Sequence, residues 1–207
     1  MLTRLSRLVE VLGVNALPLG GVLAGAWSQA TALSLYWWEN LAAGLFIAVR
    51  LWLHQRWHPD VPRPTNRLQQ PGQFFVTTLA FTIAHGVFLA VLFTTVLQTR
   101  PDAGTLRAAA LPLVALQAVA LGADLWTLHA WPQAQVLAQA DHMLGRVVLV
   151  HLSLPLGMLL FAAADREWAF FACFATLKGL SDLAQVLVRP WARAASAAPG
   201  PPAARRR

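Results

Sequence analysis

The sequence predicts an all-α fold, a polytopic transmembrane helical bundle, and three observations support this prediction. Hydrophobic residues make up 57% of the 207 residues, and the mean hydropathy is +0.52. Charged residues make up only 12%, about half of the roughly 25% that is usual in soluble domains. The apolar residues also fall into long runs, close to the ~20 residues that a helix needs to cross a bilayer.

Six apolar runs predict six spans. They cover residues 9–27, 31–52, 74–97, 107–128, 143–164 and 168–188. Together they predict one membrane-embedded domain over residues 1–193. Residues 53–73 contain Pro59, Pro62, Pro64 and Pro71 without a helical period, which predicts an irregular basic cytoplasmic loop. Residues 194–207 are of low complexity and predict a disordered basic tail.

The distribution of arginines predicts the orientation. With six spans, one side of the membrane carries Arg4, Arg7, Arg50, Arg56, Arg63, Arg67, Arg146, Arg189, Arg193 and Arg205 to Arg207. The other side carries only Arg100, Arg107 and Arg166, so both termini are expected in the cytoplasm. These arginines separate apolar runs and do not form one basic face, which favours the lipid bilayer over nucleic acid as partner. The single lysine and the abundance of Ala, Leu and Arg are typical of GC-rich bacteria, so we expect a multi-pass protein of the bacterial cytoplasmic membrane.

Polar side chains recur at helical spacing within four of the runs. These stripes are Tyr36, Glu39 and Asn40; Thr78, Thr82 and His85; Gln117 and Asp124; and Lys178, Ser181 and Asp182. Ionisable side chains are costly in hydrocarbon and normally face the bundle interior. The stripes therefore predict an intramembrane polar cluster, in which Lys178 pairs with Asp182 one turn away.

Two interpretations of this cluster stay open. In the first, the polar centre binds or translocates an ion, a proton or a small polar molecule, with Glu39 and Asp182 as acceptors. In the second, the charges form a satisfied structural network in a scaffold or interaction protein, with Lys178 neutralising one carboxylate and leaving the other either protonated or paired with Arg146.

Two histidines inside the runs suggest a third hypothesis, a haem- or metal-binding redox protein. His85 lies near the middle of the third run and His151 inside the fifth. Pro155 cannot donate to the carbonyl of His151, which leaves an acceptor beside the imidazole. The sequence contains no Cys-x-x-Cys-His or His-Glu-x-x-His motif and no hydrolase or nucleotide-binding motif, so nothing specifies a catalytic site.

Gly21 and Gly25 have the spacing of a small-residue helix-packing motif. Such a motif forms the interface of a homo-oligomer or packs against another helix of the same chain.

The chain resembles a family of prokaryotic membrane proteins of unknown function, catalogued as domain of unknown function 6498. Four segments carry the resemblance: Leu35-Tyr36-Trp37-Trp38-Glu39-Asn40, Phe81-x-x-x-His85-Gly86-Val87-Phe88, Gly145-Arg146-Val147-Val148-x-x-His151-Leu152 and Leu177-Lys178-x-x-x-Asp182-Leu183. The resemblance implies a polytopic helical membrane protein and brings no activity, cofactor or substrate. Physical reasoning and the resemblance select the same positions, namely Glu39, His85, Arg146, His151, Lys178 and Asp182.

Overall fold

The computed structural model describes residues 2–164 and 167–196, so most of the predicted tail over residues 194–207 lies outside the described residues. Every regular element in the described part is helical. The α-helices are α1 (Leu2–Leu23), α2 (Gln29–Trp57), α3 (Pro71–Val91), α4 (Ala103–Leu128), α5 (Gln133–Ala164) and α6 (Glu167–Ser196). A 3-10 helix η1 (Arg67–Gln69) precedes α3, and one π-helical segment η2 (Leu92–Val96) extends it.

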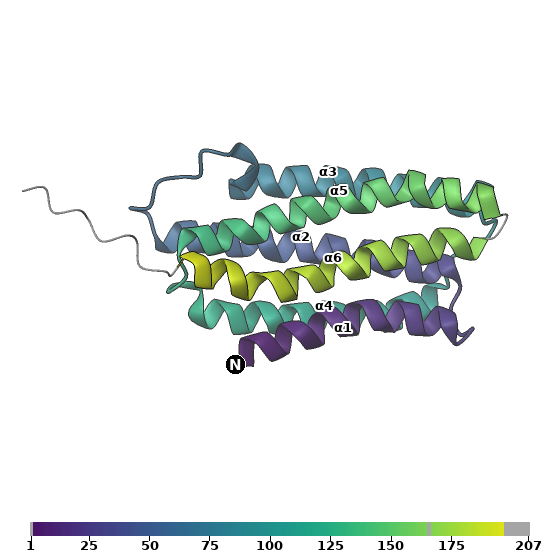
Figure 1. The fold of residues 1–207 in the computed structure, drawn as a ribbon, viewed down its shortest axis with the longest axis horizontal. Helices are drawn as coiled ribbons and strands as arrows, with labels where there is room; N and C mark the ends of the chain where they lie inside the picture. The colour runs from purple at the N-terminus through teal and green to yellow at the C-terminus, as the bar shows by residue number, and fades with distance from the viewer. Residues whose placement is uncertain (1, 165–166, 197–207) are drawn as a thin grey trace, which may run out of the picture.

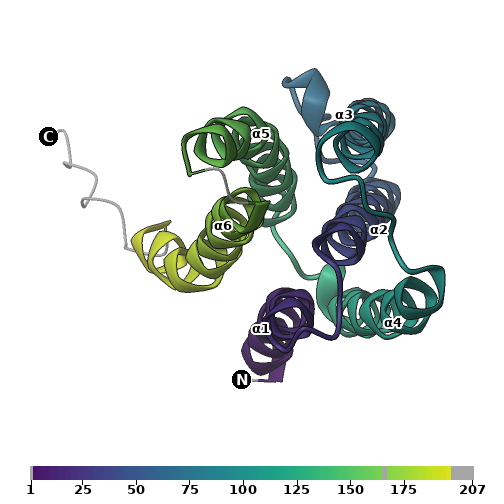
Figure 2. The ribbon, with the colours of Figure 1, turned by 90° about the vertical axis from the view of Figure 1, so that its right-hand side faces the viewer.

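The helices run side by side along the long axis of the molecule (Figure 1). Viewed from one end, α2 lies between α3 and α4, while α5 and α6 form a neighbouring pair (Figure 2). Helix α2 contacts α1, α3, α4, α5 and α6. Because the polar stripe of Tyr36, Glu39 and Asn40 lies on α2, this arrangement places it within reach of every other helix.

Local capping sets where several helices begin and end. The Ser28 side chain accepts a hydrogen bond from the Thr31 amide at the start of α2, and Asp102 accepts one from the Thr105 amide at the start of α4. Hydrogen bonds from the side chain and backbone of Thr105 lower the pKa of Asp102. Helix α1 ends before Gly25, whose positive φ of 68° suits glycine in the following turn.

Two predictions about the sequence between the spans are wrong in detail. The basic loop is shorter than residues 53–73, because α2 continues to Trp57 and α3 begins at Pro71. Arg50, which the arginine distribution assigned to the cytoplasmic side of the membrane, lies inside α2, is 8% exposed, and pairs with Asp124 of α4 at 3.0 Å. An arginine near the end of an apolar run can lie at the membrane boundary or in a buried ion pair, and its position in the sequence does not tell which.

The Gly21 and Gly25 motif is also not formed as predicted. Gly25 lies beyond the end of α1, so the two glycines do not share a helical face. The position where Gly21 would carry a Cβ is occupied by the Trp27 ring, 2.4 Å away at its nearest atom. Gly21 therefore allows Trp27 to pack closely within the same chain. Homo-oligomerisation stays a prediction, and the described structure of this turn does not support it.

Within the described part of the chain, four helical segments are long and apolar enough to cross a membrane: Gln29–Trp57, Pro71–Val96, Ala103–Leu128 and Gln133–Ala164. Within α1, a shorter apolar stretch covers Val11–Leu23. Large apolar side chains point outward from the bundle, among them Val87, Leu111 and Leu152, which are 61%, 73% and 64% exposed. Such a surface is expected to face lipid, and it agrees with a membrane protein.

Two apolar clusters fill the interior toward its two ends. One combines Tyr36 and Leu33 with Phe93, Phe171 and Phe174, and the other combines Leu51, Phe74 and Leu128 with Val136 and Met143. On α2, Glu39 and Asn40 lie between the residues that belong to these two clusters. Glu39 and Asn40 therefore lie in a polar zone between two apolar layers.

Candidate functional site

Four charged side chains from three helices meet in the polar zone. Arg146 of α5 donates to the Glu39 carboxylate of α2, and its other terminal nitrogen lies 3.5 Å from Asp182 Oδ1. Lys178 Nζ lies 3.1 Å from Glu39 Oε2 and 2.7 Å from Asp182 Oδ2. Each cation thus touches both carboxylates, which links α2, α5 and α6. We call Glu39, Arg146, Lys178 and Asp182 the ionic cluster.

Neutral side chains from α1, α2 and α4 add hydrogen bonds in and around this cluster. Asn15 Nδ2 donates to Asp182 Oδ2 at 2.9 Å, and Asn15 Oδ1 accepts from Lys178 Nζ at 3.2 Å. Asn40 Oδ1 accepts from Arg146 at 2.6 Å. Gln117 Nε2 lies 3.5 Å from Glu39 Oε1, and the Tyr36 hydroxyl donates to the Asn15 carbonyl at 3.1 Å.

The ionic cluster is deeply buried and electrically balanced. Lys178 is 0% exposed, Glu39 and Asp182 are each 3% exposed, and Arg146 is 9% exposed. With both carboxylates ionised, two positive and two negative charges give a net charge of zero. The Lys178 ammonium also lies 4.8 Å from the centre of the Tyr36 ring. The opposing charges and hydrogen bonds offset part of the cost of burying these groups.

A second polar feature, which we call the His85 cavity, lies beside the ionic cluster. It is lined by Trp37, Asn40, Thr82, His85, Val147, Val150 and His151, and has room for about one water molecule. His85 is 2% exposed, and neither of its ring nitrogens has a hydrogen-bond partner among the described residues. Asn40 belongs to both features, because its Oδ1 accepts from Arg146 while its side chain also lines the cavity.

His151 is held differently from its neighbour. Its Nδ1 lies 2.7 Å from the Val147 carbonyl in the preceding turn, and its Nε2 lies 3.2 Å from the Phe81 carbonyl of α3. His151 therefore joins α5 to α3, with its ring centre 5.6 Å from that of His85. Pro155 lies inside α5, where a proline leaves the His151 carbonyl without its usual helical donor.

The His85 and His151 pair does not fit a haem or a metal ion. The two rings meet edge to face and enclose a cavity too small for a porphyrin. Both nitrogens of His151 are already directed at carbonyl oxygens. The described residues contain no group of three or more His, Cys, Asp or Glu side chains placed to hold a metal ion. The arrangement favours a proton or a water as the occupant.

Two further histidines, His54 and His58, tie the end of α2 to the α4–α5 connection. His54 Nε2 lies 2.9 Å from the Trp131 carbonyl, and His58 Nε2 lies 3.0 Å from the His129 carbonyl. The His54 and His58 rings stack with their centres 4.4 Å apart. Both carbonyls belong to the α4–α5 connection, so the end of α2 is tied to a segment distant in sequence.

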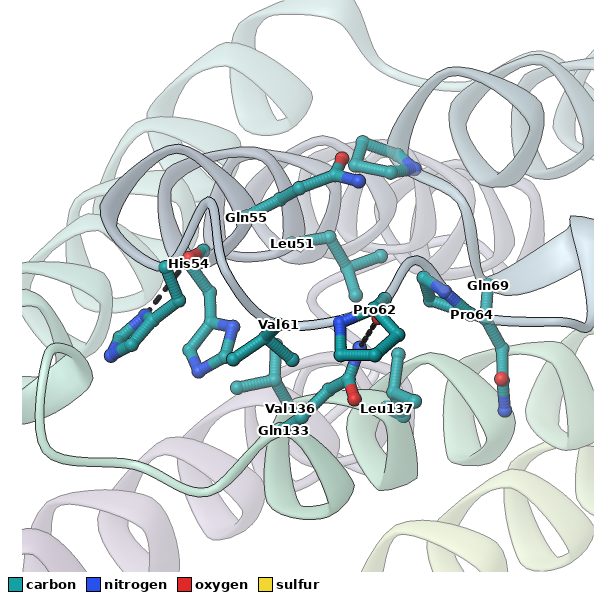
Figure 3. Close-up of a pocket in the computed structure, with 12 residues that line it drawn as sticks. Leu51, His54, Gln55, Val61, Pro62, Pro64, Gln69, Gln133, Val136 and Leu137 are labelled. Atoms are coloured by element: carbon teal, nitrogen blue, oxygen red, sulfur yellow. Dashed lines mark hydrogen bonds between the residues drawn. The ribbon is translucent and has the colours of Figure 1, made fainter.

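A shallow pocket lies under the basic loop at this end of the bundle (Figure 3). The loop residues Val61, Pro62 and Pro64 pass over the end of α2 and the start of α5 (Figure 3). Gln133 Nε2 donates to the Pro62 carbonyl at 2.8 Å, and Gln69 Nε2 donates to Asp141 Oδ1 at 2.8 Å. These bonds hold the loop on α5, and the pocket carries no charged side chain among its lining residues.

The structure brings together most residues of the predicted polar stripes, whereas Asp124 pairs with Arg50 instead. Tyr36, Glu39, Asn40, Arg146, Lys178 and Asp182 belong to one hydrogen-bonded group, and His85 and His151 lie beside it across Asn40. Sequence reasoning missed Asn15, which contacts both Lys178 and Asp182. A polar amide within the first apolar run was a usable signal, because such residues in a span commonly bond across helices.

Comparison with known proteins identifies the family. No curated protein and no solved structure matches the chain. The model of a family of unknown function, DUF6498, matches residues 2–199, which is nearly the whole sequence. The chain therefore belongs to the DUF6498 family of unknown function.

Proposed function

We propose that this chain is a six-span protein of the bacterial cytoplasmic membrane that accepts and passes protons at its buried polar centre. The observation that carries the proposal is the His85 imidazole, which is 2% exposed and lines the His85 cavity, and whose two nitrogens find no hydrogen-bond partner among the residues that the structure describes. Buried polar groups are nearly always hydrogen-bonded, so an unpartnered imidazole needs an explanation. A role in proton transfer supplies one.

The proposed topology has both termini in the cytoplasm. The start of α1, the α2–α3 loop and the end of α6 lie at the same end of the bundle (Figure 1). Most of the arginines in the predicted loops and termini also belong to this end. The excess of arginine on cytoplasmic loops supports this orientation.

The size and chemistry of the His85 cavity favour a proton over a larger solute. A single water in the cavity can accept a proton on one side and donate a proton to an imidazole on the other. A solute larger than water does not fit in the cavity. Imidazole exchanges protons readily near neutral pH. Asn40 lines the same cavity, so its side chain lies where it can orient such a water.

Proton flux into liposomes tests this proposal. The purified full chain is reconstituted into vesicles that contain a pH-sensitive dye, and a potassium diffusion potential drives proton entry. We expect measurable flux in the wild type and a loss on the order of 100-fold in His85→Gln, because glutamine retains polarity but cannot relay a proton.

His129→Gln is the matched control for this experiment. His129 is exposed in the α4–α5 connection, so its replacement is expected to leave the flux unchanged. Elution as a single species and an unchanged helical circular dichroism spectrum verify that each variant folds. Wild-type vesicles that are no leakier than empty ones, or equal flux in His85→Gln and wild type, would reject the proposal.

A structural role is the second candidate, and it is favoured by the balance of the ionic cluster. Two cations and two carboxylates satisfy one another across α2, α5 and α6. Such a network fixes the relative positions of helices without performing chemistry. If His85→Gln conducts protons like the wild type while disruption of the ionic cluster unfolds the bundle, this second function is the correct one.

A further inference from the structure

We propose that Trp52 and Arg56, at the end of α2, bind the headgroup of an anionic phospholipid. Trp52 is 54% exposed, and the Arg56 guanidinium carbon lies 5.9 Å from the centre of a Trp52 ring. An arginine held against an exposed indole combines a cation with an amphipathic aromatic ring. This combination suits the boundary between acyl chains and phosphates.

The outward face of α2 leads directly to this pair. Trp38, Leu45 and Trp52 recur every seven residues and are 42%, 46% and 54% exposed. Residues seven apart lie on the same side of a helix, so these three side chains form one outward stripe. Arg56 follows Trp52 by one helical turn and is also exposed. The pair therefore faces the surroundings of the bundle.

The length of α2 places the pair at the level of the headgroups. Helix α2 has 29 residues, whereas ~20 suffice to cross the hydrocarbon. Its last turns therefore extend into the interfacial region. Helical side chains lean toward the N-terminus of their helix, which directs Arg56 back over Trp52 and toward the bilayer. A phosphate at the membrane surface lies at this height.

Arg56 also differs from the buried arginines in its partners. Arg50 pairs with Asp124, and Arg146 pairs with Glu39 and Asp182. Among the described residues, no carboxylate forms a salt bridge with Arg56. Arg56 thus presents a cation to an anion from outside the chain, and the lipid phosphate is the anion available at this position.

The surrounding loop favours an anionic lipid over a zwitterionic one. Arg63 and Arg67 are exposed on the α2–α3 loop, and Asp60 is the acidic residue of the same loop. The loop therefore adds positive charge near Arg56. Each additional arginine near an anionic membrane surface contributes about 1 kcal/mol of attraction, whereas a zwitterionic surface provides little.

Lipid binding by the intact chain tests this site. Native mass spectrometry of the purified protein in detergent measures binding of phosphatidylglycerol and phosphatidylcholine, with inorganic phosphate added as a competitor. We expect the wild type to prefer phosphatidylglycerol, Arg56→Gln to bind it roughly five-fold more weakly, and Trp52→Leu to show a smaller loss. Phosphatidylcholine binding is expected to stay unchanged.

Two exposed residues provide matched controls. Arg100→Gln removes an exposed arginine from the α3–α4 connection, and Trp126→Leu removes a tryptophan that is 85% exposed near the end of α4. Both are expected to bind phosphatidylglycerol like the wild type. The proposal is overturned if Arg56→Gln retains full binding, if both lipids bind the wild type equally, or if millimolar phosphate displaces the lipid. This outcome is independent of whether His85 conducts protons.

Discussion

The ionic cluster and the His85 cavity lie side by side in one membrane bundle, yet they treat buried polarity in opposite ways. In the cluster, each of four charges has at least two partners, and Asn15 and Asn40 add further hydrogen bonds. In the cavity, an imidazole has none. An ionisable residue at membrane depth is therefore a weak indicator of chemistry by itself. The absence of partners is more informative, because it leaves the group available to react.

This comparison predicts that the two regions respond differently to substitution. The charges in the cluster depend on one another, so removal of one leaves an uncompensated charge in a site of low polarity. The His85 imidazole makes no hydrogen bond to the described residues, so its replacement leaves no other polar group unpaired. The predictions below test this difference.

The largest effect is expected at Lys178, which is fully buried and touches both carboxylates. Lys178→Met should lower the free energy of unfolding by about 3–5 kcal/mol, because the cluster then carries a net negative charge. Titration with a denaturing detergent, followed by helical circular dichroism, measures this loss. The double variant Lys178→Met with Asp182→Asn restores neutrality and should recover part of it. If Lys178→Met alone lowers the free energy of unfolding by less than about 1 kcal/mol, the charges of the cluster do not depend on one another for stability.

An intermediate effect is expected at Gly86, next to the His85 cavity. A Cβ there would lie 2.8 Å from Trp37 Nε1, whose N–H donates to the Thr82 carbonyl at 2.7 Å. Gly86→Ala should displace the indole and destabilise the protein by about 1–3 kcal/mol. Gly122→Ala in α4 is the matched control, because nothing lies within 4 Å of its Cβ position. That control should gain up to about 1 kcal/mol from helix propensity. If both substitutions change the free energy of unfolding by the same amount, the close contact between Gly86 and Trp37 is not important for stability.

The smallest effect on stability is expected at His85 itself. His85→Leu removes two unpartnered nitrogens and fills the site with an apolar side chain, so stability should stay within about 1 kcal/mol of the wild type. The same detergent titration provides the measurement, and proton flux should still be lost. If this variant loses as much stability as Lys178→Met, a structural role for the imidazole replaces the one proposed here.

Sequence reasoning predicted much of the helical arrangement and the membership of the polar centre. Helical spacing placed Lys178 and Asp182 together, and the structure brings their side-chain atoms to 2.7 Å. The same reasoning misplaced Arg50, because an arginine near the end of an apolar run has the same sequence pattern whether it meets water or a carboxylate on another helix. Asp124, its partner, lies 74 positions away in the chain, and no local pattern connects the two.

By itself, the sequence determined that this is an all-helical protein whose long apolar helices agree with a membrane protein and carry polar stripes. These properties follow from composition and periodicity, which are local and depend on the cost of exposing polar groups to hydrocarbon. Only the tertiary structure decided which polar groups satisfy one another. Glu39 and His85 look alike in the sequence, each an ionisable residue near the middle of an apolar run. Helix packing gives Glu39 two cations and leaves His85 facing a small cavity, because hydrogen bonding depends on distances between helices that no single helix contains.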